Sequence, residues 1–103
     1  MREMTFGPAS ALIAEMDSPD WPEALHGRVW QVHRLQVPAD QRGRGYGSAL
    51  MGRIQKHARK RGKLVLVNVK PEDDGMTVEQ LEGWYQRLGF IRIQDEPLLM
   101  VRQ

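Results

Sequence analysis

Residues 35–51 read Leu-Gln-Val-Pro-Ala-Asp-Gln-Arg-Gly-Arg-Gly-Tyr-Gly-Ser-Ala-Leu-Met, and this stretch decides the fold. It joins the end of a long strand predicted over 28–37, a tight glycine-rich loop over 43–47, and a helix from about Gly47 to Arg61. The helix is predicted because apolar residues recur at helical spacing, at Leu50, Met51, Ile54 and Ala58. A strand, a glycine-rich loop and a helix in succession suit a phosphate group, because the first turn of a helix has unpaired N–H groups and its dipole favours anions.

The same rules place the remaining elements. Residues 64–69 form a nearly continuous apolar run, as expected of a strand buried on both faces. Thr77 and Gln80 form a capping box that begins a second helix near Val78, and Gly89 ends it. Strands are also predicted at 9–16, 90–94 and 98–102, and a loop at 17–27 under which Trp21 and Trp30 are expected to pack. This order predicts an α/β or α+β sheet with helical crossovers.

Composition limits the class of protein. The chain has 103 residues, 41% apolar and 27% charged, which predicts a single globular domain over 1–103. Cysteine is absent, which excludes disulfides, thiolate metal sites and a cysteine nucleophile, and no metal site is predicted. No apolar run approaches the roughly 20 residues of a membrane span, and the N-terminus does not resemble a signal peptide. A cytoplasmic protein without a membrane partner is the simplest interpretation.

Positive charge is concentrated in one part of the chain. The net charge is only +2, yet the stretch from 53 to 63 holds Arg53, Lys56, Arg59, Lys60, Arg61 and Lys63. Such a field favours a phosphate-rich partner, either a nucleotide cofactor or a nucleic acid, although a solvated helix face is the simpler explanation. Tyr46 is the one aromatic residue close to this stretch. Few side chains are therefore available to stack on bases, so nucleic acid is the less favoured partner.

Two common phosphate-binding motifs do not fit the loop. A P-loop requires lysine before the final Ser or Thr, whereas Gly47 directly precedes Ser48 here. The dinucleotide fingerprint has Gly-x-Gly-x-x-Gly and an acidic residue after the next strand. The spacing here is Gly43-x-Gly45-x-Gly47, and the next strand ends in Asn68-Val69-Lys70.

The loop instead resembles the Arg/Gln-x-x-Gly-x-Gly/Ala signature of the GNAT superfamily of N-acetyltransferases, through Arg42-x-x-Gly45-x-Gly47. A second signature of that superfamily is similar to residues 81–90, Leu-Glu-Gly-Trp-Tyr-Gln-Arg-Leu-Gly-Phe. Both lie in the expected order within residues 29–102. The resemblance implies a mixed, mostly antiparallel sheet flanked by two main helices, with the usual N-terminal strand, helix and helix reduced.

The resemblance also implies a substrate and roles. Acetyl-CoA would be the acetyl donor, and its pantetheine arm would pair with the backbone of the strand at Leu35, Gln36 and Val37. Its pyrophosphate would lie on the loop formed by Arg42, Gly43, Arg44, Gly45, Tyr46, Gly47 and Ser48. Asn68 would line the same cleft, where the two strands diverge. Tyr85 matches the tyrosine that can protonate the departing CoA thiolate, since a tyrosine hydroxyl ordinarily keeps its proton at pH 7.

An amine acceptor must lose a proton before or during attack, so a base or a water path is needed. His33 is the favoured candidate, on the expectation that it shares a face of the strand with Leu35 and Val37. The alternative is a strand histidine that hydrogen-bonds to a neighbouring group and has no catalytic role. Glu15 and Asp17 are weaker candidates, and Gln31 cannot act as a base. Tyr85 alone would fit a core aromatic, but the adjoining Gly89-Phe90 pattern favours the catalytic role. Trp84 is expected in the core.

The N-terminal part departs from the family pattern, because only 27 residues precede the long strand and they show no helical pattern. Either the acceptor cleft is open, suiting a protein lysine or N-terminus, or a second copy supplies the missing wall as a homodimer. The acidic segment 71–75 is a candidate contact for a basic acceptor. The chain resembles short GNAT proteins of bacteria and their phages. The alternative functions are a CoA-binding regulatory module with little turnover, and nucleic-acid binding through 53–63.

Overall fold

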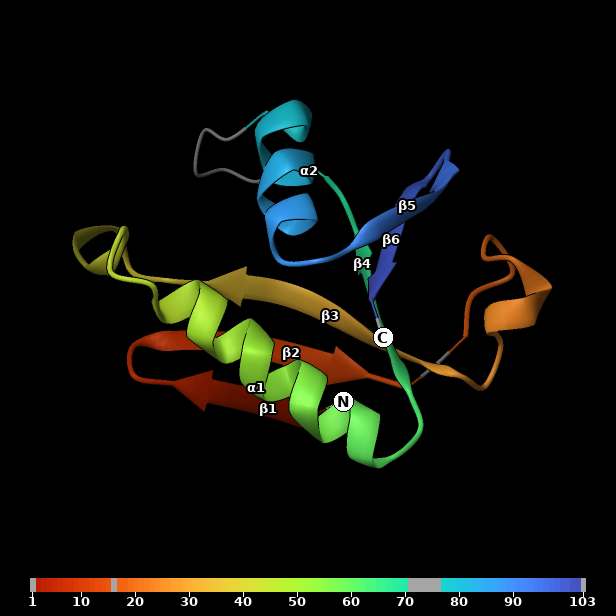
Figure 1. Ribbon diagram of the computed structural model, residues 1–103, viewed down its shortest axis with the longest axis horizontal. Helices are drawn as coiled ribbons and strands as arrows, with labels where there is room; N and C mark the ends of the chain where they lie inside the picture. The colour runs from red at the N-terminus through yellow and green to blue at the C-terminus, as the bar shows by residue number, and fades with distance from the viewer. Residues whose placement is uncertain (1, 16, 71–76, 103) are drawn as a thin grey trace.

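A computed structural model describes residues 2–15, 17–70 and 77–102. Six strands form one sheet in the order β1-β2-β3-β4-β6-β5, and two α-helices accompany it (Figure 1). Only the β3–β4 pair is parallel within the described sheet, which confirms the predicted mixed, mostly antiparallel fold. The strands are β1 (Arg2–Phe6), β2 (Ala9–Ala14), β3 (Val29–Gln36), β4 (Leu64–Asn68), β5 (Ile91–Asp95) and β6 (Leu98–Arg102), the helices are α1 (Tyr46–Lys60) and α2 (Val78–Arg87), and the 3-10 turns are η1 (Glu23–Leu25) and η2 (Ala39–Gln41).

Both predicted helices form with the expected faces. The apolar side of α1 is completely buried at Leu50, Met51, Ile54 and Ala58. The α2 capping box is also present: the Thr77 hydroxyl accepts from the Gln80 N–H at 3.1 Å, and the Gln80 side chain accepts from the Thr77 N–H at 2.9 Å. Local spacing and capping were therefore sufficient to place these helices.

The N-terminal segment contains a strand that the sequence did not predict. β1 pairs antiparallel with β2 through a turn at Gly7 and Pro8, and the described part of the strand expected over 9–16 ends at Ala14. β1 was missed because it is a sheet edge, exposed at every position except the partly buried Met4. An edge strand of this kind lacks the apolar alternation that identifies a half-buried strand.

A β-bulge in β3 changes which side chains share a face. Ser10 pairs with Gln36 and Leu12 with His33, so β3 has one extra residue, and Arg34 adopts a φ of 50°. Because of this extra residue, Leu35 packs on the same core cluster as Val32. His33 follows Val32 directly and projects to the opposite side. The expectation that His33 shares a face with Leu35 and Val37 was therefore wrong.

The two faces of the sheet carry separate apolar clusters. The larger cluster holds the buried faces of α1 and α2 together with Trp30, whereas Trp21 packs on the other face against Val29, Leu66, Leu99 and Val101. The prediction that both tryptophans pack under the 17–27 loop is correct for Trp21 and wrong for Trp30. Trp30 is 1% exposed, and its indole N–H donates to Glu15.

Candidate functional site

A groove opens where β3 and β4 diverge. Their parallel ladder runs from Val29 and Leu64 to Val32 and Val67, and beyond it β3 continues alongside β2 as far as Gln36. The groove has a volume of about 1050 Å³, and its walls are the second half of β3, the end of β4, the start of α1, and α2. Pockets of about 300–1000 Å³ hold most small ligands, so this one is large enough for an extended molecule.

The glycine-rich loop forms one end of the groove. Gly43 and Gly45 both have φ near +81°, a conformation that L-residues rarely adopt, and Gly45 is the N-cap of α1. A Cβ atom at either position would have no neighbour within 4 Å, so the backbone is open to solvent and to a ligand. The N–H groups of the first turn of α1, which a helix leaves unpaired, begin at Tyr46. The loop therefore fits an anionic group such as a pyrophosphate.

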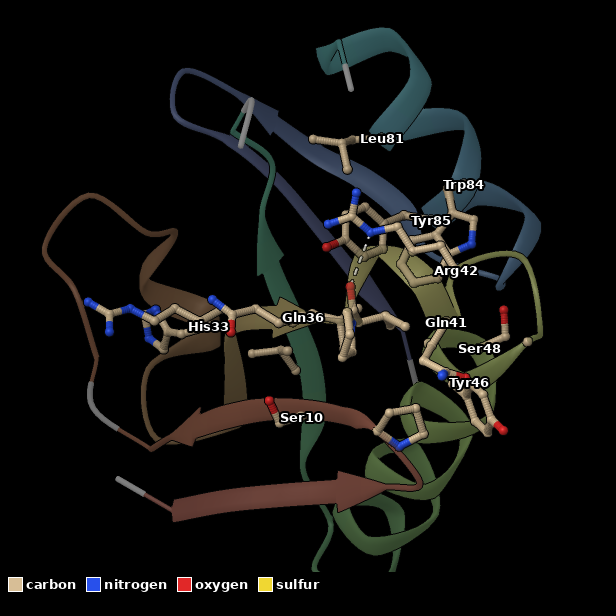
Figure 2. A pocket seen from close by; sticks show the side chains of 18 of the residues that line it. Ser10, His33, Gln36, Gln41, Arg42, Tyr46, Ser48, Leu81, Trp84 and Tyr85 are labelled. Atoms are coloured by element: carbon tan, nitrogen blue, oxygen red, sulfur yellow. Dashed lines mark hydrogen bonds between the residues drawn. The ribbon is translucent and has the colours of Figure 1, made fainter. Parts of the chain in front are cut away.

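Arg42 lies across this end of the groove. Its Nε donates to the main-chain carbonyl of Val37 at 3.1 Å, as the dashed line in Figure 2 shows. The guanidinium is exposed, so its other N–H donors can reach an anion in the groove. The contact joins the predicted phosphate loop to the predicted pantetheine-pairing strand.

Trp84 lines the groove instead of belonging to the core, so the prediction for it was wrong. A Cβ atom on Gly47 would lie 3.5 Å from its ring and 3.6 Å from Val37, so the indole closes the wall above the start of α1. Its neighbour Tyr85 also lines the groove and packs edge-on against Trp84 and Phe90, with centroid distances of 5.1 and 5.4 Å. These contacts hold the phenol ring in the wall (Figure 2).

His33 lies at the end of the groove opposite Ser48, as Figure 2 shows. Burial lowers the pKa of His33 below its ordinary value of 6.5, and the positive charges of Lys70 and Arg34 lower that pKa further. The imidazole is therefore neutral at pH 7, which is the state needed to accept a proton. Both faces of β3 contribute to the groove, which explains why His33 and Leu35 line it despite the bulge between them.

The groove brings together twelve of the thirteen predicted site residues, namely His33, Leu35, Gln36, Val37, Arg42, Gly43, Gly45, Tyr46, Gly47, Ser48, Asn68 and Tyr85. Arg44 is exposed outside the lining, as are the weaker base candidates Glu15 and Asp17. The predicted acidic contact at 71–75 lies outside the described residues. Sequence reasoning missed Ser10, because only strand pairing brings β2 beside β3. It also missed Lys70, although the position of Lys70 two residues after Asn68 could have indicated that it lines the same groove.

The family follows from sequence comparison. Residues 10–92 match the family model described as "Acetyltransferase (GNAT) domain", which covers most of the chain and includes both signatures. The chain belongs to the GNAT acetyltransferase family. A curated relative, glucosamine 6-phosphate N-acetyltransferase 1 of Oryza sativa subsp. japonica, is 39% identical over 66 residues, or 63% of the chain. The match spans 35% of that relative, so the chain corresponds to about a third of its length.

Solved structures agree with this GNAT fold. The anti-CRISPR protein AcrVA5 superposes with a TM-score of 0.74 over 99% of this chain and 97% of its own, at 18% identity. A putative acetyltransferase from Exiguobacterium sp. 255-15 gives 0.61 at 18% identity, over 92% of this chain and 53% of its own. An aminoglycoside 6'-N-acetyltransferase complexed with coenzyme A gives 0.57 at 14% identity, over 91% and 63%. At these identities the likeness concerns the fold.

No helix among the described residues is long and apolar enough to cross a membrane. Within 2–15, 17–70 and 77–102, the acidic and histidine side chains form no group of three that could hold a metal ion.

Proposed function

We propose that this GNAT protein transfers an acetyl group from acetyl-CoA to a primary amine by direct attack. The observation that carries the proposal is the arrangement of the groove: the glycine loop and the N-terminus of α1 lie at one end, and Tyr85 lies in its wall. When bound, acetyl-CoA would supply the activated acetyl thioester. The chain's own residues would bind it, orient it and move two protons.

Binding would use the loop and β3. The open backbone at Gly43 and Gly45, with the N–H groups that follow, suits the pyrophosphate, and Arg42 adds a charged donor. The stretch beyond the β3–β4 ladder, from Leu35 near the end of β3 to Val37 just after it, offers main-chain groups to the pantetheine amides. The carbonyl of Val37 already accepts from Arg42, so a pantetheine amide would use its second lone pair or would replace a guanidinium that shifts toward the phosphates.

The proton movements would use two side chains. The amine nitrogen forms a bond to the acetyl carbon as the carbon–sulfur bond breaks. The Tyr85 hydroxyl gives its proton to the departing sulfur, and the attacking nitrogen loses a proton to His33, directly or through water. The lowered pKa of His33 keeps its ring neutral and ready for this step at pH 7.

The acceptor is proposed only as a class. The rice relative and the aminoglycoside 6'-N-acetyltransferase are both named for amine-bearing small molecules, whereas AcrVA5 is named as an anti-CRISPR protein. The groove is polar around His33, because Arg34 and Lys70 lie close enough to lower its pKa and both line the groove. A protein lysine or N-terminus and an amino sugar are therefore both to be assayed.

The test combines calorimetric titration of acetyl-CoA with an assay for released CoA thiol in the presence of candidate amines. Arg42→Ala with Gly45→Glu should abolish micromolar binding, because the glutamate places bulk and negative charge in the phosphate site. The matched control, Arg28→Ala with Gly52→Glu, makes the same changes at exposed positions outside the groove and should bind normally.

A second variant avoids the strain of a side chain at the positive φ of Gly45. Ser48→Glu places a carboxylate in the exposed first turn of α1. There the carboxylate interacts favourably with the helix dipole, so the fold is kept, but it repels and displaces the pyrophosphate. Absence of acetyl-CoA binding by the parent protein would refute the acetyltransferase proposal. Binding without thiol release for any amine would favour the alternative, a CoA-binding regulatory module.

A further inference from the structure

The cations of α1 form a second surface that the cofactor groove does not use. The sequence has no Asp or Glu between Asp40 and Glu72, so the whole of α1 lacks a carboxylate. Arg53, Lys56, Lys60 and Arg61 are exposed along the helix and its C-terminal end. None of them lines the groove described above.

Three arginines and a histidine from two elements converge on a shallow concavity of about 330 Å³. Arg53, His57 and Arg61 come from consecutive turns of α1 and its C-cap, and Arg2 comes from the start of β1. Figure 1 shows β1 running beside α1 on the outer edge of the sheet. The glycine loop, by contrast, lies at the other end of α1. We call these four residues the α1–β1 basic cluster.

Trp30 holds two members of this cluster in place. The guanidinium carbons of Arg2 and Arg61 lie 4.8 and 5.4 Å from its ring centroid, and the ring itself is 1% exposed. Arg61 also donates to the main-chain carbonyl of His57 at 3.4 Å. Arginines that rest on an aromatic face lose less conformational freedom when they bind an anion. The donors are therefore partly organised before any partner arrives.

The positive charges act on one another. Partial desolvation and the charges of Arg61, Lys60, Arg53 and Arg2 lower the pKa of His57 below 6.5. Glu3 is the one carboxylate among the residues described as lining the concavity. Two ion pairs in the described residues join Arg92 to Glu82 and to Asp95, and neither involves a member of the cluster. The cluster thus presents a net positive field to the solvent.

From this geometry we infer that the α1–β1 basic cluster binds the phosphodiester backbone of a nucleic acid, independently of base sequence. Guanidinium groups match phosphate oxygens with paired N–H donors, and a row from Arg53 to Arg61 spans about 12 Å of helix. Contacts would be confined to the backbone, because Trp30 is covered and cannot stack on a base. The inference is independent of the proposed acetyl transfer.

The experiment is fluorescence anisotropy of a labelled random-sequence DNA duplex and a labelled single-stranded RNA, titrated with the full chain at 50–200 mM salt. About three phosphate contacts predict a slope of log K against log salt near −2.7 for the duplex, or about a 40-fold loss of affinity across this range. Arg53→Gln with Arg61→Gln should bring the slope close to −1.

Two further variants test whether misfolding, or the loss of any two exposed cations, explains a loss of affinity. Arg53→Glu leaves the Arg61–Trp30 contact intact and should weaken binding at least 10-fold at 50 mM salt, so misfolding cannot explain the loss. The control, Arg28→Gln with Arg87→Gln, removes two exposed cations elsewhere and should stay within about 2-fold of the parent. Thermal melts of all variants verify the fold.

Several outcomes would overturn the inference. They are the absence of binding at 100 µM protein and 50 mM salt, an equal loss in the control variant, and displacement by acetyl-CoA, which would place the nucleic acid on the glycine loop. Equal competition by polyglutamate at matched charge would assign the surface to an acidic protein instead.

Discussion

Arg42 and Val37 are joined by a 3.1 Å hydrogen bond from the guanidinium Nε to a main-chain carbonyl. The bond connects the glycine-rich loop, which is proposed to bind the pyrophosphate, to the end of the strand that is proposed to pair with pantetheine. A bound pyrophosphate would draw the guanidinium away and release the carbonyl for the amide of the ligand. One residue would then link occupation of the two halves of the site.

Replacing Arg42 should weaken acetyl-CoA binding to a degree that depends on the new residue. A hydrogen bond to a charged group contributes about 1.5–3 kcal/mol, so Arg42→Ala should raise the Kd about 10–150-fold. Arg42→Lys should lie in between, because lysine keeps the charge but loses the planar fork. Calorimetric titration measures both. Equal affinities for the parent and the alanine variant would show that Arg42 does not contact the phosphates.

Tyr85→Phe should separate chemistry from binding. The phenyl ring keeps the packing against Trp84 and Phe90, while the proposed proton donor is removed. We expect kcat to fall about 10²-fold or more, with the Kd for acetyl-CoA changed less than about 3-fold. Steady-state rates and calorimetry on the same preparation decide this. An unchanged kcat would exclude Tyr85 as the acid.

His33→Gln should remove the acid limb of the pH–rate profile. The lowered pKa of His33 places that limb of kcat/KM below pH 6.5 in the parent protein, because the base works only when neutral. The control is His26→Gln, an exposed histidine whose side chain meets the Ser18 carbonyl outside the groove. If the limb survives in His33→Gln, the base is water or another group.

Two glycines of the same loop should respond differently to alanine. Gly45 has a φ of +81°, so Gly45→Ala should lower the free energy of unfolding by about 1–2 kcal/mol. At Gly47 the added methyl would lie 3.5 Å from Trp84, an ordinary contact in a helical residue, so Gly47→Ala should cost far less. Urea unfolding compares them. A similar loss in both variants would contradict the assigned backbone geometry.

Stability should fall when the pH is lowered from 7.5 to 5.5. Burial and nearby cations lower the pKa of His33, and partial desolvation with four cations lowers that of His57. Around and below pH 6.5 the unfolded chain therefore binds more protons than the folded chain, so the free energy of unfolding falls as acid is added. The double variant His33→Gln, His57→Gln should show a flatter dependence in urea melts. If the parent protein is equally stable across this pH range, the pKa values of His33 and His57 are not lowered in the folded state.

Several elements could be predicted because their causes are local. The helical spacing of Leu50 to Ala58, the capping box at Thr77 and the apolar run at 64–69 each depend on residues a few positions apart. The two signatures also predicted the family, and the resemblance built on them predicted twelve of the residues that line the groove. β1 was not predictable in this way, because an exposed edge strand is stabilised by its pairing with β2 and carries little pattern of its own.

The sequence by itself determined the geometry of the glycine-rich loop, since glycines at 43 and 45 and the start of a helix at Tyr46 are properties of neighbouring residues. Only the tertiary structure decided which side His33 faces, which tryptophan lies on which side of the sheet, and that Arg2 joins Arg53 and Arg61 on one surface. The physical reason is that a single extra residue at Arg34 inverts the alternation of β3, and strand pairing then brings distant residues together without leaving a trace in local spacing.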